Sequence, residues 1–270
     1  MSVASTTMAH MPHVRPPETV DSALRCSDEG MPDAENAARH GVAVKTIRRW
    51  RRQYQRRGLP RGQAHTSVPC PRCQGKELDR EAYSELLGWY LGDGWLEDHK
   101  GRGVYALHVY NDATYTDLNA RIQELMRRVK PGSRPSTRMV PGCVVTTVSW
   151  KHWRCLFPQH GPGRKHERTI RLEPWQQEIV DAHPGALLRG LFHSDGCRVA
   201  NWATRTVAGE RKRYEYGRWQ FVNHSTDIQR ICTDALDSLS IPWRQSSWKQ
   251  VSVSRREAVE RLDELLGPKS

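Results

Sequence analysis

Two aspartates carry the clearest chemical signal in this sequence. Asp93 closes the stretch LLGWYLGDG at residues 86–94, and Asp195 closes the stretch LRGLFHSDG at residues 188–196. Both stretches read apolar, any residue, Gly, four mostly bulky or apolar residues with a small one closing, then Asp-Gly, and no other Asp-Gly dipeptide occurs in the chain. The aspartates are 102 residues apart in one shared register. Two matched copies of this kind indicate a duplicated domain.

If each stretch is a helix, its small residues form a stripe with almost no side chain. Gly88 and Gly92 lie four residues apart on one face, as do Gly190 and Ser194 in the second copy. Glycine inside a helix costs roughly 0.5–1 kcal/mol relative to alanine, so this pattern predicts a compensating close contact between two helix backbones. The pairing would bring both carboxylates to the helix C-termini, where the helix dipole disfavours them. A divalent cation between them would offset the repulsion, because Mg²⁺ and Ca²⁺ bind hard oxygen ligands.

A lone Asp-Gly dipeptide is often only a turn that closes an apolar segment. Two copies in one register favour a shared role instead. Both stretches resemble the dodecapeptide motif of LAGLIDADG homing endonucleases, and the acidic position of each motif is occupied. The resemblance covers about residues 83–267 and takes the two-motif, single-chain form.

This resemblance implies an architecture and a reaction. In that family the motif helices form the interface between two αββαββα halves, and a saddle of strands lies along the DNA major groove. Carried over, Asp93 and Asp195 would bind Mg²⁺, which activates a water for in-line attack on double-stranded DNA. Family members also place a lysine near the end of a late strand, for which Lys249 is the candidate and Lys151 the weaker one; either could equally contact the DNA backbone or lie on a solvated surface. The strands would read bases through Thr147, Ser149, Gln220, Asn223, Gln245, Lys249 and Ser252.

Cys70 and Cys73 carry a second chemical signal. A C-x₂-C pair supplies two of the four ligands that a tetrahedral Zn²⁺ site needs. No second C-x₂-C pair exists in the sequence, so the other ligands must come from elsewhere. The candidates are His65, Cys155, His160 and His166. The alternative is that the thiols are free and buried.

A helix-turn-helix is predicted near the N-terminus. Helical patterns run over residues 19–26, 33–40 and 44–57, and Gly41 ends the second of them. The string AARHGVAVKTIRRWRRQYQRRG resembles the helix-turn-helix of transposases and regulators, with an apolar stripe and a basic face on its third helix. The alternative is an ordinary amphipathic helix pair with a solvated basic face. The third helix would contact DNA through Lys45, Thr46, Arg48, Arg49 and Arg52.

The composition favours a nucleic-acid partner. The 270 residues include 42 Lys and Arg against 30 Asp and Glu, a formal charge of +12, which favours binding of a polyanion. No apolar run approaches the 18 or so residues of a membrane span, and the first 20 residues lack a signal-peptide core, so no membrane partner is expected. Seven scattered cysteines do not form a secreted disulfide framework, so we expect a cytoplasmic, nucleoid-associated protein.

The elements that would position these residues occur twice in the order helix, strands, helix, strands, helix, which matches the αββαββα half-domain of the resembled family. The resemblance therefore implies an α+β fold, a pseudo-two-fold domain of two αββαββα halves, preceded by a small all-α domain. In the first half we expect helices at 81–95, 115–129 and 150–157 and strands at 104–109 and 143–149. In the second half we expect helices at 186–193, 227–239 and 256–266 and strands at 197–203, 214–222, 243–246 and 250–254.

The predicted domains follow from these elements. They are a disordered leader at 1–17, the helix-turn-helix at 18–58, a linker with the cysteine pair at 59–80, a first half at 81–160, a basic connector at 161–183 and a second half at 184–270. The connector contains Arg164, Lys165, Arg168 and Arg171. It could track a phosphate backbone or help to complete the zinc site, and the sequence leaves both open.

Two functions compete on this basis. The two retained aspartates favour a site-specific, divalent-metal-dependent DNA endonuclease, a monomer whose halves act as a pseudo-dimer. The helix-turn-helix favours a transcriptional regulator, because a bacterial regulator family keeps the LAGLIDADG fold beside such a motif and uses it without cleavage. An RNA-processing protein of the same fold is a third reading. Since the chain starts at Met1 and lacks a terminal His-Asn followed by a nucleophile, we expect a free-standing protein rather than an intein.

Overall fold

The computed structural model describes residues 15–57, 69–99 and 103–269, and the chain divides into two compact units at residues 67 and 68. Most of the predicted leader, and residues 59–68 of the predicted linker, lie outside the described residues. Residue 17, assigned to the leader, begins a helix. In the described part of the chain, no helix combines the length and the apolar character needed to cross a bilayer.

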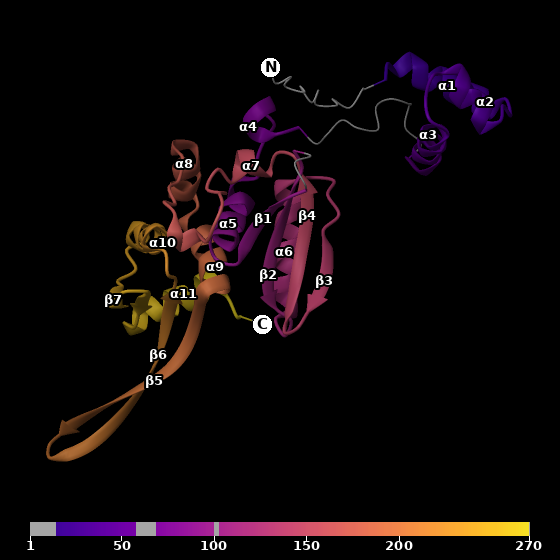
Figure 1. Ribbon diagram of the computed structural model, residues 1–270. Helices are drawn as coiled ribbons and strands as arrows, with labels where there is room; N and C mark the ends of the chain where they lie inside the picture. Colours follow the sequence, from indigo (N-terminus) through magenta and orange to yellow (C-terminus); the bar gives the residue numbers. More distant parts are fainter. Residues whose placement is uncertain (1–14, 58–68, 100–102, 270) are drawn as a thin grey trace, which may run out of the picture. The chain divides into compact units, whose positions relative to one another are not determined.

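The described part of the first unit, residues 15–57, contains three helices: α1 (Pro17–Asp28), α2 (Asp33–Arg39) and α3 (Val44–Arg57) (Figure 1). Gly41 has a φ of 59°, a left-handed conformation that suits glycine, and it turns the chain between α2 and α3. Leu24, Ile47 and Trp50 are buried together in a small core. The buried Asn36 amide donates hydrogen bonds to the Ala23 carbonyl and the Ser27 hydroxyl, at 2.6 and 2.8 Å, which ties α2 to α1.

The second unit contains the predicted αββαββα order twice (Figure 1). After α4 (Pro71–Gln74), the first half contains α5 (Arg80–Leu91), β1 (Gly94–Asp98), β2 (Tyr105–Asp112), α6 (Thr116–Val129), β3 (Ser136–Val140), β4 (Cys143–Trp150) and α7 (Trp153–Leu156). A 3-10 turn at Lys165–Glu167 and α8 (Pro174–Ala182) lead to the second half. That half contains α9 (Pro184–Asp195), β5 (Gly196–Val207), β6 (Glu210–Val222), α10 (Thr226–Ser238), β7 (Arg244–Ser247), β8 (Gln250–Val253) and α11 (Arg256–Leu266).

Each half forms one antiparallel sheet of four strands, and the strand orders correspond. The orders are β1-β2-β4-β3 and β5-β6-β8-β7. In Figure 1, α5 and α9 lie side by side between the sheets, and α6 covers β2 and β4. A single apolar core runs through both halves and includes Leu87 and Leu187 from the two central helices.

The central helices touch backbone to backbone at their glycines. A Cβ built on Gly88 would lie 2.9 Å from the Gly190 Cα and 2.8 Å from the Leu191 nitrogen, where no side chain fits. A Cβ built on Gly190 would lie 2.9 Å from the Gly88 Cα. One turn further on, Gly92 faces Ser194, whose hydroxyl folds back onto the carbonyls of Gly190 and Leu191 at 2.9 Å each. The absent side chains are therefore what lets the two helix ends converge.

Several predicted boundaries were wrong. The first motif helix ends at Leu91 rather than at residue 95, because Gly92 leaves helical geometry and Gly94 begins β1. The predicted basic connector contains a helix that was not expected, α8, whose residues Gln176, Ile179 and Val180 are buried. The closing helix of the first half has only four residues, Trp153–Leu156. Strands β1 and β3 had not been located; β3 is almost entirely exposed, so its sequence has no apolar alternation.

Strands β5 and β6 are much longer than predicted. They pair from Gly196 opposite Phe221 to Val207 opposite Glu210, whereas β8 covers only residues 219–222 of β6. Residues 201–216 therefore form a two-stranded ribbon, which we call the hairpin arm, and it projects beyond the sheet in Figure 1. Ala208 and Gly209, with φ of 53° and 82°, form its two-residue turn. Both faces of the outer arm are exposed, which explains why the sequence shows no strand pattern there.

Candidate active site

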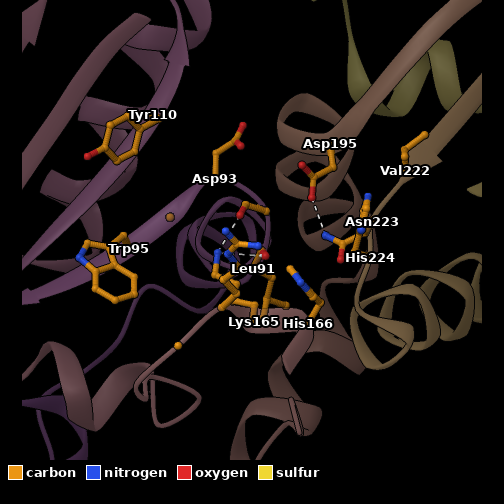
Figure 2. A pocket seen from close by; sticks show the side chains of 14 residues that line it. Leu91, Asp93, Trp95, Tyr110, Lys165, His166, Asp195, Val222, Asn223 and His224 are labelled. Carbon is orange, nitrogen blue, oxygen red and sulfur yellow. Dashed lines mark hydrogen bonds between the residues drawn. The ribbon is translucent and has the colours of Figure 1, made fainter. Parts of the chain in front are cut away.

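Both aspartates lie at one cavity, at the ends of the central helices. Asp93 follows α5, and Asp195 is the last residue of α9. Both line a cavity of about 780 Å³, to which the two halves and the connector contribute. Figure 2 shows the carboxylates with Trp95 and Tyr110 on one side and Asn223 on the other. The fold thus brings together two acids that lie 102 residues apart in the chain.

The two carboxylates are held in different ways. Asp195 accepts a hydrogen bond of 2.6 Å from the Asn223 side-chain amide. For Asp93 the described residues supply no side-chain hydrogen-bond partner, and neither aspartate lies within 4.0 Å of a Lys, Arg or His nitrogen in the described chain. The Asp93 carbonyl accepts from the Tyr110 amide at 3.2 Å, which fixes the backbone after α5. The Asp93 carboxylate is therefore free to take a ligand.

The electrostatics of this pair favour a bound cation. Burial raises the pKa of Asp195 to about 6, and the nearby Asp93 carboxylate raises it as well, although the Asn223 hydrogen bond lowers it. Burial also raises the pKa of Asp93, against the effect of two nearby lysines. Both shifts mean that the site disfavours two uncompensated negative charges, which a cation would relieve.

One of the two lysines caps the end of α5. The Lys165 ammonium, from the connector, donates to the carbonyls of Tyr90, Leu91 and Gly92, at 3.1 Å for Leu91 and 2.7 Å for Gly92. These groups are the unpaired carbonyls of a helix C-terminus, where a cation is favourable. Burial lowers the pKa of Lys165 to about 8, whereas three carbonyl acceptors match the three N–H groups of the ammonium and favour the charged form. Lys165 is thus a fixed positive charge beside both acids.

The second lysine, Lys269, contacts the backbone at the end of α9. Lys269, near the C-terminus, donates to the Gly196 carbonyl at 2.8 Å, directly after α9. Burial lowers its pKa, while Asp93 and Asp195 are among the groups that raise it. Sequence reasoning counted Lys165 only as one of four basic connector residues and did not single out Lys269. No local signal could have found either, because each reaches its helix end from a segment distant in sequence.

Of the other predicted catalytic and reading residues, Asn223 lines the cavity, whereas the two lysines do not. Lys249 is not among the residues that line the cavity, and its ammonium lies 5.9 Å from the Trp248 ring centre. Lys151 is exposed after β4. Ser252 was wrong as a base reader, since its side chain is buried at 1% exposure. Asn223 is engaged with Asp195 rather than pointing away from the cavity.

The structure brings the cysteine pair together with a third cysteine and a histidine. Cys70, Cys73, Cys155 and His152 place one ligand atom each within 4.8 Å of one another. Cys155 was among the predicted partners, but the histidine is His152. His160 lies instead against the rings of Trp95 and Tyr105, His166 lines the cavity of the aspartates, and His65 lies outside the described residues.

The predicted DNA-contacting residues of the first unit lie on α3. Lys45, Arg49 and Arg52 are exposed, and Thr46 is half-buried. Arg48 is exposed but its Nε donates to the Asp33 carboxylate at 3.0 Å, an ion pair that also includes Arg51. Four of the five residues are thus accessible, and Arg48 has a competing partner in α2.

Comparisons with known proteins find two resemblances. Residues 22–61 match the family model of a homeodomain-like domain. A search of curated proteins finds no match. Among solved structures, the chain is similar to I-DmoI in complex with DNA and calcium, with a TM-score of 0.44 and 15% identity over 71% of this chain and 92% of that chain. It is also similar to the N-terminal LAGLIDADG domain of DUF199/WhiA, with a TM-score of 0.43 and 14% identity over 70% of this chain and 83% of that chain.

A third similar structure is the LAGLIDADG meganuclease I-AabMI bound to uncleaved DNA, with a TM-score of 0.43 and 11% identity over 68% of this chain and 82% of that chain. The chain is therefore similar to LAGLIDADG homing endonucleases, as its two motifs predict. At such low identity the likeness concerns the fold alone, and the roles of individual residues depend on the geometry of the site.

Proposed function

We propose that this protein is a site-specific, divalent-metal-dependent DNA endonuclease with an accessory helix-turn-helix, acting as a monomer whose two halves form a pseudo-dimer. One observation carries the proposal: the ends of α5 and α9 present two carboxylates to one cavity, and the pKa of each is raised. A protein that needed these aspartates only for helix packing would gain stability from neutral residues there.

Asp93 and Asp195 would hold the metal. Carboxylate oxygens are the ligands that Mg²⁺ and Mn²⁺ prefer, and the Asp93 carboxylate has no side-chain partner within the described chain. Bound there, Mg²⁺ would lower the pKa of a coordinated water and polarise the scissile phosphate. Asn223 holds one Asp195 oxygen in place, and the Lys165 ammonium keeps the end of α5 fixed and partly offsets the repulsion between the acids. Lys165 is therefore a positioning residue.

The hairpin arm supplies a second contact with DNA. A two-stranded ribbon fits the major groove, and the arm carries four basic residues against two acidic ones. Arg205 pairs directly with Lys212 across its ladder. Like charges in that position destabilise the free ribbon, and a phosphate between them would remove the repulsion. The arm would thus extend the contact surface beyond the cavity, while the helix-turn-helix adds a separate reader through Lys45, Arg49 and Arg52.

Selection of duplexes from a random library, followed by incubation of the selected duplexes with Mg²⁺, tests the proposal. The wild type should cut a selected duplex only when Mg²⁺ or Mn²⁺ is present. Asp93→Asn and Asp195→Asn should each lower the cleavage rate by about 10³-fold or more, because metal catalysis supplies several kcal/mol. Both should still bind the duplex.

Asp181→Asn is the matched control. It makes the same chemical change on the exposed face of α8, where Gln177 contacts the carboxylate, and it should leave cleavage unchanged. Tight binding by the wild type with no cleavage in Mg²⁺ or Mn²⁺ would refute the enzyme proposal.

One observation favours the second function, a transcriptional regulator that uses this fold without cleavage. Lys165 and Lys269 lie near both aspartates, and their two positive charges equal the two negative ones. The cluster can therefore be neutral without a metal. In that case promoter occupancy and the transcriptional response should survive Asp195→Asn, as chromatin immunoprecipitation and a reporter assay would show.

A further inference from the structure

The four-residue cluster outside the cavity has the composition and spacing of a structural metal site. Cys73 Sγ lies 3.4 Å from Cys155 Sγ, and Cys155 Sγ lies 3.6 Å from His152 Nδ1. All four ligand atoms, including Cys70 Sγ, lie within 4.8 Å of one another. A tetrahedral site with Zn–S bonds of 2.3 Å separates its ligand atoms by about 3.8 Å, close to these values. We propose that Cys70, Cys73, His152 and Cys155 bind one structural Zn²⁺.

The local structure suits this role on both sides of the cluster. Cys70 is the residue before α4, and Gly75 ends α4 with a φ of 64°, so one tight turn holds both thiols. Backbone N–H groups of Arg72 and Cys73 donate hydrogen bonds to the Cys70 sulfur. Such N–H to sulfur bonds favour the thiolate, which is the form that binds metal. His152 and Cys155 are three residues apart at the start of α7 and so share one face of a turn.

Without a metal, this cluster would be unfavourable. The His152 Nε2 atom is buried without a hydrogen-bond partner among the described residues. A disulfide would engage only two of the four side chains. A softly coordinating cation with four nitrogen and sulfur ligands engages them all, and a tetrahedral Cys₃His set is typical of Zn²⁺.

The metal would join two elements that are too short to be stable alone. Both α4 and α7 have four residues, and Cys73 and Cys155 are 82 residues apart. Zn²⁺ would cross-link them and anchor the start of the second unit to the end of the first half. Arg72 lies over the Trp175 ring at 4.5 Å, which adds a contact between α4 and α8. The inference does not depend on the proposed nuclease activity.

Metal analysis of the full-length chain, purified under reducing conditions without chelator, tests the site. Mass spectrometry of the elements should find about one Zn²⁺ per chain. Cys73→Ser and His152→Ala should each reduce the zinc content at least severalfold, and Cys73→His should restore part of it. The controls are Cys143→Ser and His160→Ala, which change the same residue types outside the cluster and should retain the metal.

Two further measurements keep the test decisive if a variant fails to fold. In the native wild type, exposed Cys73 should resist alkylation while exposed Cys197 reacts, and a zinc chelator should abolish this difference. Removal of Zn²⁺ should also lower the Tm by about 5 °C or more. A wild type with less than a tenth of an equivalent of zinc, a Cys73–Cys155 disulfide, or equal zinc contents in Cys73→Ser and Cys143→Ser would each overturn the proposal.

Discussion

The two halves of the second unit share a backbone plan but support it differently. The central helix of the first half carries the buried Glu85, which accepts hydrogen bonds from Arg121 of the same half and from Arg189 of the second half. The cysteine cluster also belongs to this part of the chain, since it joins α4 to α7. The second half has Leu187 at the position 102 residues after Glu85, and Ser254 and Glu257 where His152 and Cys155 would recur. It has the hairpin arm instead. The buried Glu85 and the cysteine cluster thus have no counterpart in the second half, and the hairpin arm has none in the first.

The ends of the central helices show a different kind of correspondence. Lys165 caps α5 and Lys269 contacts the residue after α9, and both come from the segment that follows the closing helix of their own half. The segments differ in length and sequence, since Lys165 follows α7 by nine residues and Lys269 follows α11 by three. The shared requirement is a cation at a helix C-terminus beside a buried carboxylate. The two lysines therefore make corresponding contacts, although the segments that carry them do not correspond in sequence.

The largest expected effect concerns the buried Glu85, which has no counterpart in the second half. Glu85→Gln should lower the free energy of unfolding by about 3–5 kcal/mol, because two arginines lose the charge of their buried partner. The control is Glu124→Gln, which removes an exposed partner of Arg121 and should cost less than about 1 kcal/mol. Urea titration measures both. Similar losses in the two variants would show that the buried charge of Glu85 contributes no more to stability than the exposed charge of Glu124.

The contact between the two central helices at Gly88 and Gly190 should be equally sensitive to substitution on either helix, whereas Glu85 has no counterpart in the second half. Gly88→Ala and Gly190→Ala should each cost about 1–3 kcal/mol or more, because each new Cβ meets backbone of the opposite helix. Gly161→Ala is the control, since its Cβ would meet the Arg168 side chain at an ordinary 3.5 Å. Thermal unfolding of the three variants compares them. Very different costs at Gly88 and Gly190 would mean that the helices do not share this contact equally.

Neutralising Asp195 should stabilise the fold. The pKa of Asp195 in the folded chain, about 6, lies above its ordinary value of 3.8, so its ionisation destabilises the fold as pH rises through about 6. In buffer without Mg²⁺ or Mn²⁺, Asp195→Asn should therefore be more stable than the wild type by about 1–3 kcal/mol at pH 8. The gain should disappear near pH 4. Urea titrations across this range measure it, with Asp181→Asn as a variant that should show no such gain.

The smallest effect concerns the hairpin arm. Arg205→Ala combined with Lys212→Ala should weaken binding to all duplexes and reduce the salt dependence of log K by about two units of slope. Stability should not fall, because the change removes a repulsive cross-strand pair. Arg256→Ala combined with Arg261→Ala on α11 removes the same charge from a helix and should leave the slope unchanged. Equal slopes for the two double variants would remove the arm from the proposed DNA surface.

The sequence alone determined the features that depend on neighbouring residues. The paired motifs, their glycine stripes, the repeated order of helices and strands and the three N-terminal helices follow from periodicity and spacing within short windows. The complete αββαββα plan was implied by the resemblance to the LAGLIDADG family, since β1 and β3 were not located from the sequence pattern. Short-window patterns did not predict β3 or the outer hairpin arm, because strands exposed on both faces show no alternation of apolar and polar residues. They also did not predict α8, which lies in a polar connector.

Only the tertiary structure decided which distant residues meet. Lys165 and Lys269 reach the helix ends, His152 joins the cysteines in place of His160 or His166, and Lys249 lies outside the lining of the cavity. Each of these outcomes depends on where a loop ends after the helices have packed, and nothing within a few residues of the side chain specifies that. The paired aspartates could be expected from their spacing, whereas the charges that surround them could not.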